Sequence, residues 1–244
     1  MAGNWKMYKT VSETSAFFEK FCPLVDKTND RDIVICPTFV NLAAAVETTK
    51  GTRVEIGAQN LYWAKEGAYT GEISGPMLVA VGVKWVLVGH SERRQYFGET
   101  NETVLKRTQA ALECGLRPIV CVGERLEERE SGATNSVLEE QFRDGIAALT
   151  PEQFAKIVIA YEPVWAIGTG KTATPEIAEQ AHAHIRSLAN SKYGSDAASN
   201  IRILYGGSVK ADNAKTLMSQ PDIDGVLVGG ASLDPASFAA IVNY

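Results

Sequence analysis

Short apolar runs alternate with longer amphipathic segments along the whole chain, and this alternation limits the possible folds more than any other feature. Several runs, such as Val86-Leu87-Val88 and Ile157-Val158-Ile159, are almost continuously apolar, which is typical of parallel strands covered on both faces. The expected strands are an N-terminal segment leading into Asn4 and residues 32–36, 54–58, 85–89, 118–122, 157–161, 201–205 and 225–229.

The segments between these runs begin with helix signals. Thr10 and Glu13 fit a capping box, and Thr174-Pro175 and Asp234-Pro235 each place an N-cap residue before a proline at the first helical position. Eight strand-then-helix units without a linker predict a closed parallel (β/α)8 barrel, in one α/β domain spanning residues 1–244. A doubly wound open sheet is the alternative, but the first strand-to-helix turn carries no GxGxxG sequence.

Composition narrows the class of protein and its partners. The net charge of −5 argues against nucleic acid or an acidic membrane surface as the main partner. No apolar run approaches the ~20 residues that a membrane helix needs. The four cysteines show neither a CxxC pattern nor zinc-type spacing, so we expect free thiols in a reducing cytoplasm. Because the chain is negatively charged overall, the charge of an anionic substrate would have to be compensated by groups close to it in the site.

Polar residues follow the expected strands at their C-terminal ends, where parallel barrels place their catalytic groups. We expect these residues to meet at one mouth of the barrel. They are Asn4, Lys6, His90, Glu162, Gly206-Gly207-Ser208 and Gly229-Gly230.

Glu162 is followed by a segment, residues 163–171, that fits neither a strand nor a helix. Bulky residues such as Trp165 stand at one end and glycines such as Gly168 near the middle, a composition that suits a lid moving on short hinges. A lid that closed Ile167 over Glu162 would remove water from the carboxylate and raise its basicity, as proton abstraction from carbon requires. Most glutamates at strand ends are only solvated, but this neighbourhood favours a catalytic base.

His90 and Lys6 are the other two candidates for catalytic groups. A lone histidine is often a satisfied core or surface residue, but residues 91–94 could open a helix directly after His90. A helix N-terminus disfavours the imidazolium, which would leave a neutral ring able to donate a hydrogen bond to a carbonyl. Lys6 could be a surface lysine, but its place beside Asn4 at the mouth favours a fixed positive charge near the substrate.

The glycine pairs after the last two strands are candidates for a phosphate site. Gly206-Gly207-Ser208 and Gly229-Gly230 could be tight turns only. Barrels, however, often bind phosphate with backbone N–H groups after these two strands. With Gly168 from the lid, they could surround a phosphate without any arginine.

Three other kinds of site are not favoured. His182 and His184 are two residues apart on an expected helix and would point to different faces, which makes a poor metal pair. Lys156 precedes its strand, at the wrong end for a Schiff-base lysine. No serine or cysteine lies in a nucleophile-elbow motif.

The candidate residues lie in motifs that closely resemble the triosephosphate isomerase family. The matches run in order from residue 2 to the last expected helix, and the motifs around His90 and after Glu162 are each highly specific. The motifs are Ala2-Gly3-Asn4-Trp5-Lys6-Met7, Gly57-Ala58-Gln59-Asn60, Gly89-His90-Ser91-Glu92-Arg93-Arg94, Val120-Cys121-Val122-Gly123-Glu124, Ala160-Tyr161-Glu162-Pro163-Val164-Trp165-Ala166-Ile167-Gly168-Thr169-Gly170-Lys171, Tyr205-Gly206-Gly207-Ser208-Val209 and Val228-Gly229-Gly230-Ala231-Ser232-Leu233.

The resemblance implies a TIM barrel and a reaction. The enzyme would interconvert dihydroxyacetone phosphate and D-glyceraldehyde 3-phosphate through an enediolate, a step of glycolysis and gluconeogenesis. Glu162 would be the base, and a neutral His90 would donate a hydrogen bond to the carbonyl oxygen. Lys6 and Asn4 would stabilise charge at that oxygen and position the substrate, and Glu92 would support the site around Lys6 and assist proton transfer.

The resemblance also implies how the phosphate is held. Backbone N–H groups of Gly168, Ser208, Gly229 and Gly230 would bind it. No metal and no organic cofactor is implied.

Family members are usually homodimers in which the loop after the third strand inserts into the partner beside its lysine. The corresponding loop here runs from Gln59 to Glu72, with Thr70 as an expected interface contact. Its aromatic residues are Tyr62, Trp63 and Tyr69. Such a patch would be unusual on the surface of a monomer, which favours a homodimer.

The N-terminal segment departs from the family pattern. Family members usually carry several more residues before Gly3-Asn4-Trp5-Lys6, whereas here Met1 and Ala2 alone precede that motif. We therefore expect a shortened first strand.

Two rival functions remain open on the sequence. Another phosphate-binding barrel enzyme, such as an aldolase or a different sugar-phosphate isomerase, would need a mid-strand lysine or metal ligands. A non-catalytic barrel that serves as a scaffold would be expected to have lost at least one of Lys6, His90 and Glu162.

Overall fold

The computed structural model describes residues 1–167 and 172–244. Eight parallel strands form a closed barrel in chain order, each strand paired with its neighbours in sequence and β1 paired with β8. The predicted closed (β/α)8 barrel is confirmed, and the open sheet is excluded. The strands are β1 (Ala2–Asn4), β2 (Ile33–Cys36), β3 (Val54–Ala58), β4 (Trp85–Val88), β5 (Arg117–Val122), β6 (Val158–Tyr161), β7 (Ile203–Tyr205) and β8 (Gly225–Val228).

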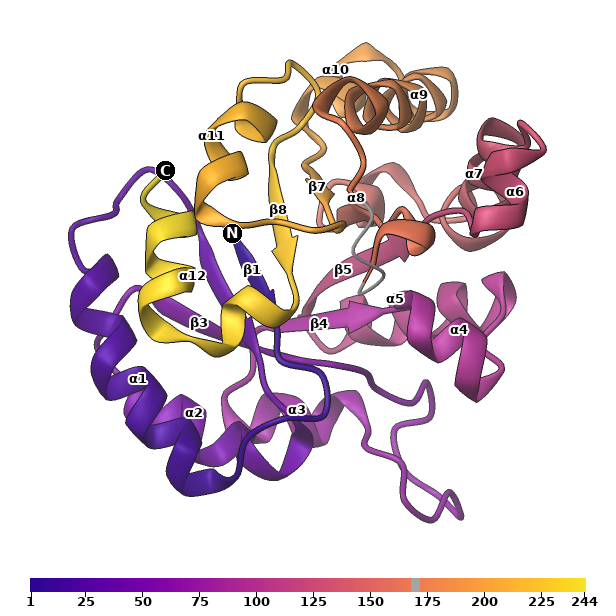
Figure 1. The fold of residues 1–244 in the computed structure, drawn as a ribbon. Helices are drawn as coiled ribbons and strands as arrows, with labels where there is room; N and C mark the ends of the chain where they lie inside the picture. The colour runs from indigo at the N-terminus through magenta and orange to yellow at the C-terminus, as the bar shows by residue number, and fades with distance from the viewer. Residues whose placement is uncertain (168–171) are drawn as a thin grey trace.

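Helices surround the strands on the outside (Figure 1). They are α1 (Val11–Val25), α2 (Leu42–Thr48), α3 (Gly75–Val81), α4 (Ser91–Phe97), α5 (Asn101–Glu113), α6 (Leu126–Glu130), α7 (Thr134–Gly145), α8 (Pro151–Phe154), α9 (Pro175–Tyr193), α10 (Ser195–Asn200), α11 (Ala211–Met218) and α12 (Pro235–Val242). Short 3-10 turns are η1 (Phe39–Asn41), η2 (Val164–Ala166) and η3 (Gly230–Leu233). No helix of the described residues combines the length and apolarity needed to cross a membrane.

The predicted helix starts are present. Thr10 caps α1 and Glu13 reaches back to the Thr10 backbone N–H at 2.7 Å, completing the capping box. Thr174 and Asp234 accept the N-cap hydrogen bonds of α9 and α12 in front of their prolines. Each cap satisfies a backbone N–H that the helix leaves without a partner, so these sequences fix where the helices begin.

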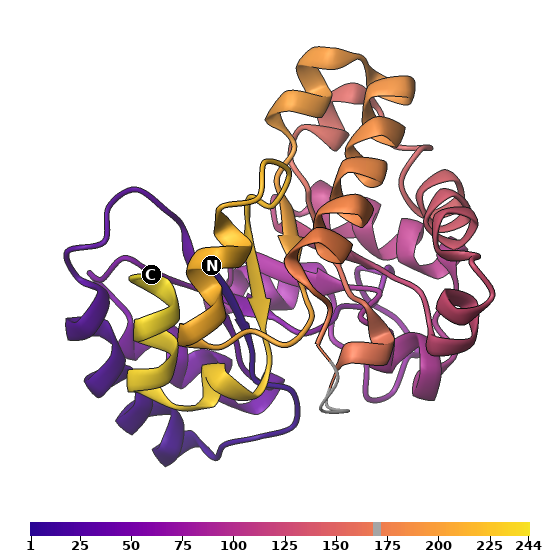
Figure 2. The ribbon, with the colours of Figure 1, turned by 45° about the horizontal axis from the view of Figure 1, so that its top comes forward.

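Strand β1 is short, as expected, but it closes the barrel on both sides. Gly3 pairs with Ile35 of β2 and with Val228 of β8. The last helix supports this closure because α12 packs beside α1 (Figure 2). Phe21 of α1 stacks on Phe238 of α12 with ring centroids 5.3 Å apart.

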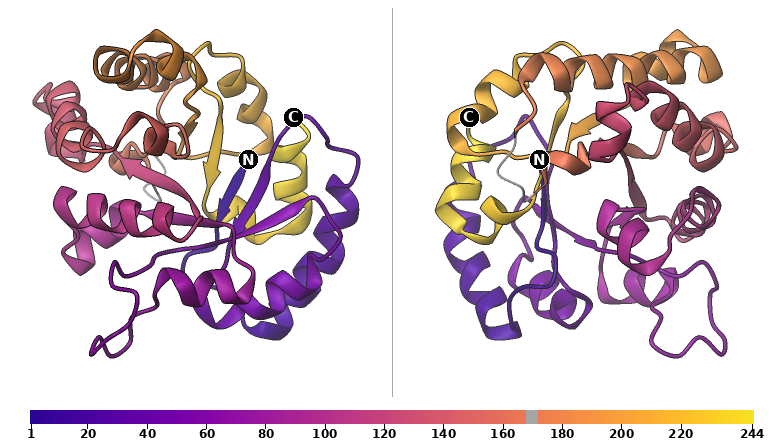
Figure 3. Two further views of the ribbon diagram at one scale, coloured as in Figure 1. Left: turned by 180° about the vertical axis from the view of Figure 1, so that it is seen from behind. Right: turned by 45° about the vertical axis from the view of Figure 1, so that its right-hand side comes forward.

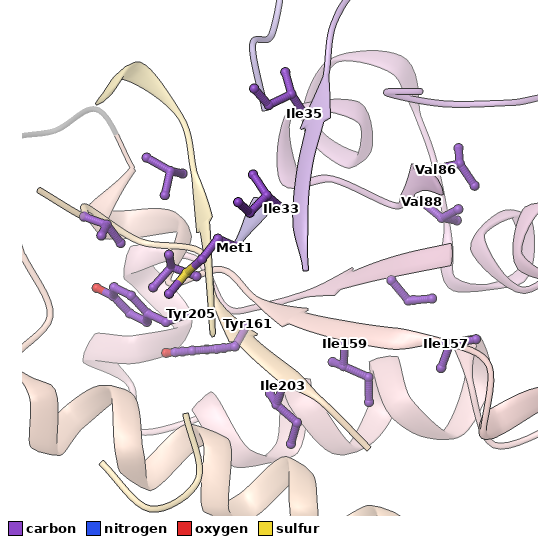
Figure 4. Close-up of a cluster of buried hydrophobic side chains, with 14 of the residues drawn as sticks. Met1, Ile33, Ile35, Val86, Val88, Ile157, Ile159, Tyr161, Ile203 and Tyr205 are labelled. Carbon is purple, nitrogen blue, oxygen red and sulfur yellow. The ribbon is translucent and has the colours of Figure 1, made fainter. Parts of the chain in front are cut away.

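The period of two along each strand divides the buried side chains into two layers. Alternate residues such as Val34 and Leu87 fill the barrel interior. The residues between them, such as Ile33, Ile35 and Val88, pack outward under the helices, and Figure 4 shows part of this outer layer. Burial on both faces explains why the strands are almost continuously apolar.

The loop between β3 and α3 projects from the barrel (Figures 1 and 3). Its three aromatic residues form one contiguous, partly exposed cluster, in which the ring centroids of Tyr62 and Tyr69 lie 4.6 Å apart. Tyr62 stacks on Trp63 at 4.1 Å, and the Arg107 guanidinium lies 5.0 Å from the Trp63 ring, so both rings are half-buried. Tyr69 is exposed.

Candidate functional site

The C-terminal ends of the strands surround a cavity of about 340 Å³. The structure brings together here the described residues that the sequence singled out, with Glu92 lying beside them. The lining residues from that set are Asn4, Lys6, His90, Glu162, Gly206, Gly207, Ser208, Gly229 and Gly230.

Glu162 is held at the end of β6 by the two adjacent strands. Its backbone N–H donates to the Val122 carbonyl at 2.7 Å, and the Gly206 N–H donates to the Tyr161 carbonyl at 2.7 Å. Gly123 must lack a side chain, since a Cβ there would lie 1.7 Å from the Glu162 carbonyl oxygen. Close packing of three strand ends therefore positions this carboxylate.

The Glu162 side chain is 2% exposed and contacts His90 and Ser91. Oε1 lies 2.8 Å from His90 Nε2, and Oε2 accepts the Ser91 backbone N–H at 2.9 Å. Burial alone would raise the pKa of Glu162, but the His90 and Ser91 contacts and the charge of Lys6 lower it below its usual value. The carboxylate is thus ionised in this arrangement.

His90 is the N-cap residue of α4. Its Nδ1 accepts the Glu92 backbone N–H at 3.2 Å, which assigns the remaining ring proton to Nε2, facing Glu162. Burial lowers the pKa of His90, while the Glu162 carboxylate raises it to give a net upward shift. The Glu92 carboxylate also raises the pKa of His90, whereas the backbone N–H on Nδ1 favours the neutral ring.

Lys6 lines the same cavity as Glu162 and has a constrained backbone conformation. Its φ is +51°, in the left-handed region that few non-glycine residues adopt. Its backbone is fixed on both sides, because its N–H donates to Asn4 Oδ1 at 2.9 Å and its carbonyl accepts Gln59 Nε2 at 2.8 Å. Nζ forms an ion pair with Glu92 Oε1 at 2.5 Å.

The two glycine turns meet different constraints. A Cβ on Gly207 would lie 2.2 Å from Tyr205 Oη, so that glycine is required by packing. On Gly229 the nearest atom would be Lys6 Cε at 3.5 Å, and on Gly230 nothing lies within 4 Å. The second turn therefore leaves open space at Gly230, as a ligand bound by N–H groups would need.

Asn213, on the first turn of α11, was not anticipated from the sequence. Its Oδ1 accepts the Lys210 backbone N–H at 2.8 Å, and its Nδ2 donates to the Ser208 carbonyl at 3.2 Å. It thus braces the turn that follows β7. The spacing of Lys210 and Asn213 is that of a capping box, but a lysine in the N-cap position concealed the pattern.

The predicted lid, residues 163–171, is described only over residues 163–167, and Gly168 lies outside the described residues. Ala166 and Ile167 line the cavity. Before them, Trp165 Nε1 and the Tyr161 hydroxyl donate to Oε1 of the buried Glu124, at 2.8 and 3.1 Å. Burial raises the pKa of Glu124. This contact anchors the segment where it leaves β6.

The two histidines of α9 point to different sides, as expected. His182 is buried against Tyr161 and Tyr205, and its Nδ1 lies 3.1 Å from the Asp222 carbonyl. His184 Nε2 lies 3.5 Å from Glu139 of α7. Within residues 1–167 and 172–244, no group of three or more His, Cys, Asp or Glu side chains is arranged to hold a metal ion.

Comparisons with known proteins agree over the whole chain. The family model described as triosephosphate isomerase matches residues 1–244. A protein of Solibacter usitatus is 70% identical over 244 residues, which cover 100% of this chain and 98% of that protein. Proteins of Citrifermentans bemidjiense and Moorella thermoacetica are each 54% identical over 100% of this chain and 97% of their own length. All three carry the name triosephosphate isomerase.

Proposed function

The chain belongs to the triosephosphate isomerase family, and from this membership we propose how the residues around its cavity divide the reaction among them. The enzyme is an isomerase that interconverts dihydroxyacetone phosphate and D-glyceraldehyde 3-phosphate. The reaction moves protons between neighbouring carbons and oxygens of the substrate, so no proton is gained or lost overall.

Glu162 is the base of the proposed mechanism. It leaves His90 and Ser91, takes a proton from the carbon beside the carbonyl of dihydroxyacetone phosphate, and later returns a proton to the neighbouring carbon. The observation that carries this role is the buried carboxylate, 2% exposed, in one cavity with a histidine, a lysine and two glycine turns. A carboxylate in a site with little water is a stronger base once its two hydrogen bonds are broken.

His90 and Lys6 stabilise the enediolate that forms between the two proton transfers. The Nε2–H of a neutral His90 donates to the substrate carbonyl oxygen after Glu162 has moved away. Lys6 supplies positive charge near the same oxygen. Asn4 orients Lys6 by accepting a hydrogen bond from the Lys6 backbone N–H. Glu92 holds the Lys6 ammonium at 2.5 Å and assists proton transfer.

The phosphate is bound at the opposite side of the cavity, by the turns after β7 and β8. We assign backbone N–H groups of Ser208, Gly229 and Gly230 to it, with Gly168 as a fourth contact from the lid. The open space beside Gly230 supports this assignment. Binding the phosphate away from the reacting carbons would fix the substrate while Glu162 works.

Replacing Glu162 by Gln tests this division of labour. We expect turnover in a coupled assay of triose phosphate interconversion to fall by roughly three orders of magnitude or more, because the amide cannot accept the carbon-bound proton. Inhibition by inorganic phosphate should persist, because the glycine turns are untouched. Equal losses of turnover and phosphate binding would contradict the assignment, and an inactive wild-type protein would favour a scaffold.

We also propose that the chain works as a homodimer in the cytoplasm. Exposed apolar side chains lie in the projecting loop from Gln59 to Glu72 and in the segments that follow β1, β2, β3 and β4. They include Met7, which is 90% exposed, and Val40, Tyr69, Met77, Tyr96 and Phe97. Covering them with a second copy would remove a large apolar surface from water. Four free cysteines suit a reducing compartment.

A further inference from the structure

Lys210 lines the phosphate side of the cavity and has no role in the mechanism above. It follows the Gly206-Gly207-Ser208 turn and is the N-cap residue of α11. Its side chain is exposed, and among the described residues no carboxylate lies within 4.0 Å of its ammonium. Lys6, the other lysine of the lining, is held by Glu92 at 2.5 Å.

The charges of the cavity make this free ammonium significant. Glu92 balances Lys6, and Glu162 is an ionised carboxylate in the same cavity. Without Lys210, the ionised groups Lys6, Glu92 and Glu162 would include one more carboxylate than cations. A triose phosphate, which is close to a dianion at neutral pH, would be repelled by that excess, and the net charge of −5 would repel it further.

The backbone of Lys210 is fixed although its side chain is exposed. Its N–H donates to Asn213 Oδ1 at 2.8 Å, and its carbonyl accepts the Ala214 N–H of α11 at 3.0 Å. Asn213 also binds the Ser208 carbonyl at 3.2 Å, so the base of the Lys210 side chain and the glycine turn form one braced unit. The Lys210 side chain therefore extends from a fixed backbone position beside the backbone that would hold the phosphate.

We propose that Lys210 is a substrate-capture residue: its ammonium attracts the phosphate of the incoming triose phosphate and raises the rate of productive encounter, without acting on the reacting carbons. This inference rests on the proposed function of the site. An unpaired, exposed cation acts through long-range attraction that salt screens, whereas the backbone N–H contacts act at short range. The two contributions can therefore be separated by ionic strength.

The test compares Lys210→Gln, Lys210→Arg and Lys215→Gln with the wild type. Lys215 is a matched control, because it is an exposed lysine of the same helix, α11, outside the cavity lining. At ~10 mM ionic strength, where the Debye length is ~30 Å, Lys210→Gln should lower kcat/KM for glyceraldehyde 3-phosphate roughly two- to fivefold with little change in kcat. The difference should vanish at ~0.5 M salt, and Lys210→Arg and Lys215→Gln should match the wild type.

Binding of inorganic phosphate, followed by its protection against thermal unfolding, provides a readout that needs no catalysis. Lys210→Gln should weaken this binding at low salt by a similar factor. Unchanged kcat/KM and phosphate binding in Lys210→Gln at low salt would overturn the proposal. So would an equal loss in Lys215→Gln, which would indicate net charge alone, or a loss of kcat that persists at high salt. A wild-type protein that binds phosphate but lacks isomerase activity would refute the proposed function instead.

Discussion

Glu162 lies in contacts that oppose its proposed use as a base. His90 and Ser91 both bind the carboxylate, and each hydrogen bond stabilises its ionised form and lowers its pKa. The sequence-based expectation that burial makes this group more basic is therefore incomplete for the resting site. In the proposed mechanism, burial supplies the basicity only after the carboxylate has exchanged these two partners for the substrate.

His182 provides a prediction about pH and stability at the residue scale. Burial lowers its pKa from 6.5 to about 4 in the folded chain. As pH falls below about 6.5, the unfolded chain binds a proton that the folded chain does not accept. The free energy of unfolding should therefore decrease by about 3 kcal/mol by the time pH reaches about 4.

Urea unfolding at pH 7, 6 and 5 measures this dependence. His182→Asn should lose most of the wild-type decrease between pH 6.5 and 5, because the amide can donate to the Asp222 carbonyl but does not titrate. His184→Asn, which retains His182, should keep the decrease. If His182→Asn keeps the wild-type pH dependence, other groups cause it.

At the scale of the elements, the site depends on how closely β5, β6 and β7 approach one another. Gly123→Ala would place a Cβ 1.7 Å from the Glu162 carbonyl oxygen. Neither the Gly123 backbone nor the Glu162 backbone can move without breaking the hydrogen bonds between β5 and β6. We expect a loss of about 3 kcal/mol or more in unfolding free energy and a large drop in kcat, because the end of β6 must shift. Denaturant unfolding and steady-state kinetics measure both effects.

Gly145→Ala is the matched control for this substitution. A Cβ at Gly145 would have its nearest neighbours at 3.7 Å, an ordinary contact, at the end of helix α7. This variant should be as stable as the wild type or slightly more stable, with unchanged kcat. A Gly123→Ala protein that behaved in the same way would show that the strand ends tolerate displacement of Glu162.

At the scale of the whole molecule, the homodimer proposal gives a test of mass and activity together. The chain has a mass of 26.4 kDa, and sedimentation at micromolar concentration should give twice that value. Thr70→Arg, at the exposed tip of the projecting loop, should shift the mass toward one chain and reduce activity, because the loop is proposed to contact the partner beside its Lys6.

Thr216→Arg adds the same charge on the exposed face of α11 and should leave both mass and activity unchanged. A wild-type mass of one chain, with full activity, would contradict the proposed assembly. Dissociation of both variants would show that added charge, not the loop, disrupts it.

The sequence by itself determined the architecture of this protein and where its candidate groups lie along the chain. Continuous apolar runs can be buried only on two faces, and capping residues such as Thr10 fix helix starts locally, so the barrel order and the strand ends carrying Lys6, His90 and Glu162 could be predicted. The predicted and observed strand limits still differ by up to two residues, because pairing with neighbouring strands decides where a strand stops. The resemblance supplied the substrate.

Only the tertiary structure decided which groups bind one another. The Glu162 contacts with His90 and Ser91, the Lys6–Glu92 ion pair and the Asn213 brace join residues or backbone atoms whose distances depend on barrel closure and side-chain rotamers. The same holds for Tyr62 and Trp63, which Arg107 of a separate helix covers. Spacing along a chain carries no such information, since hydrogen bonds and charges act through space.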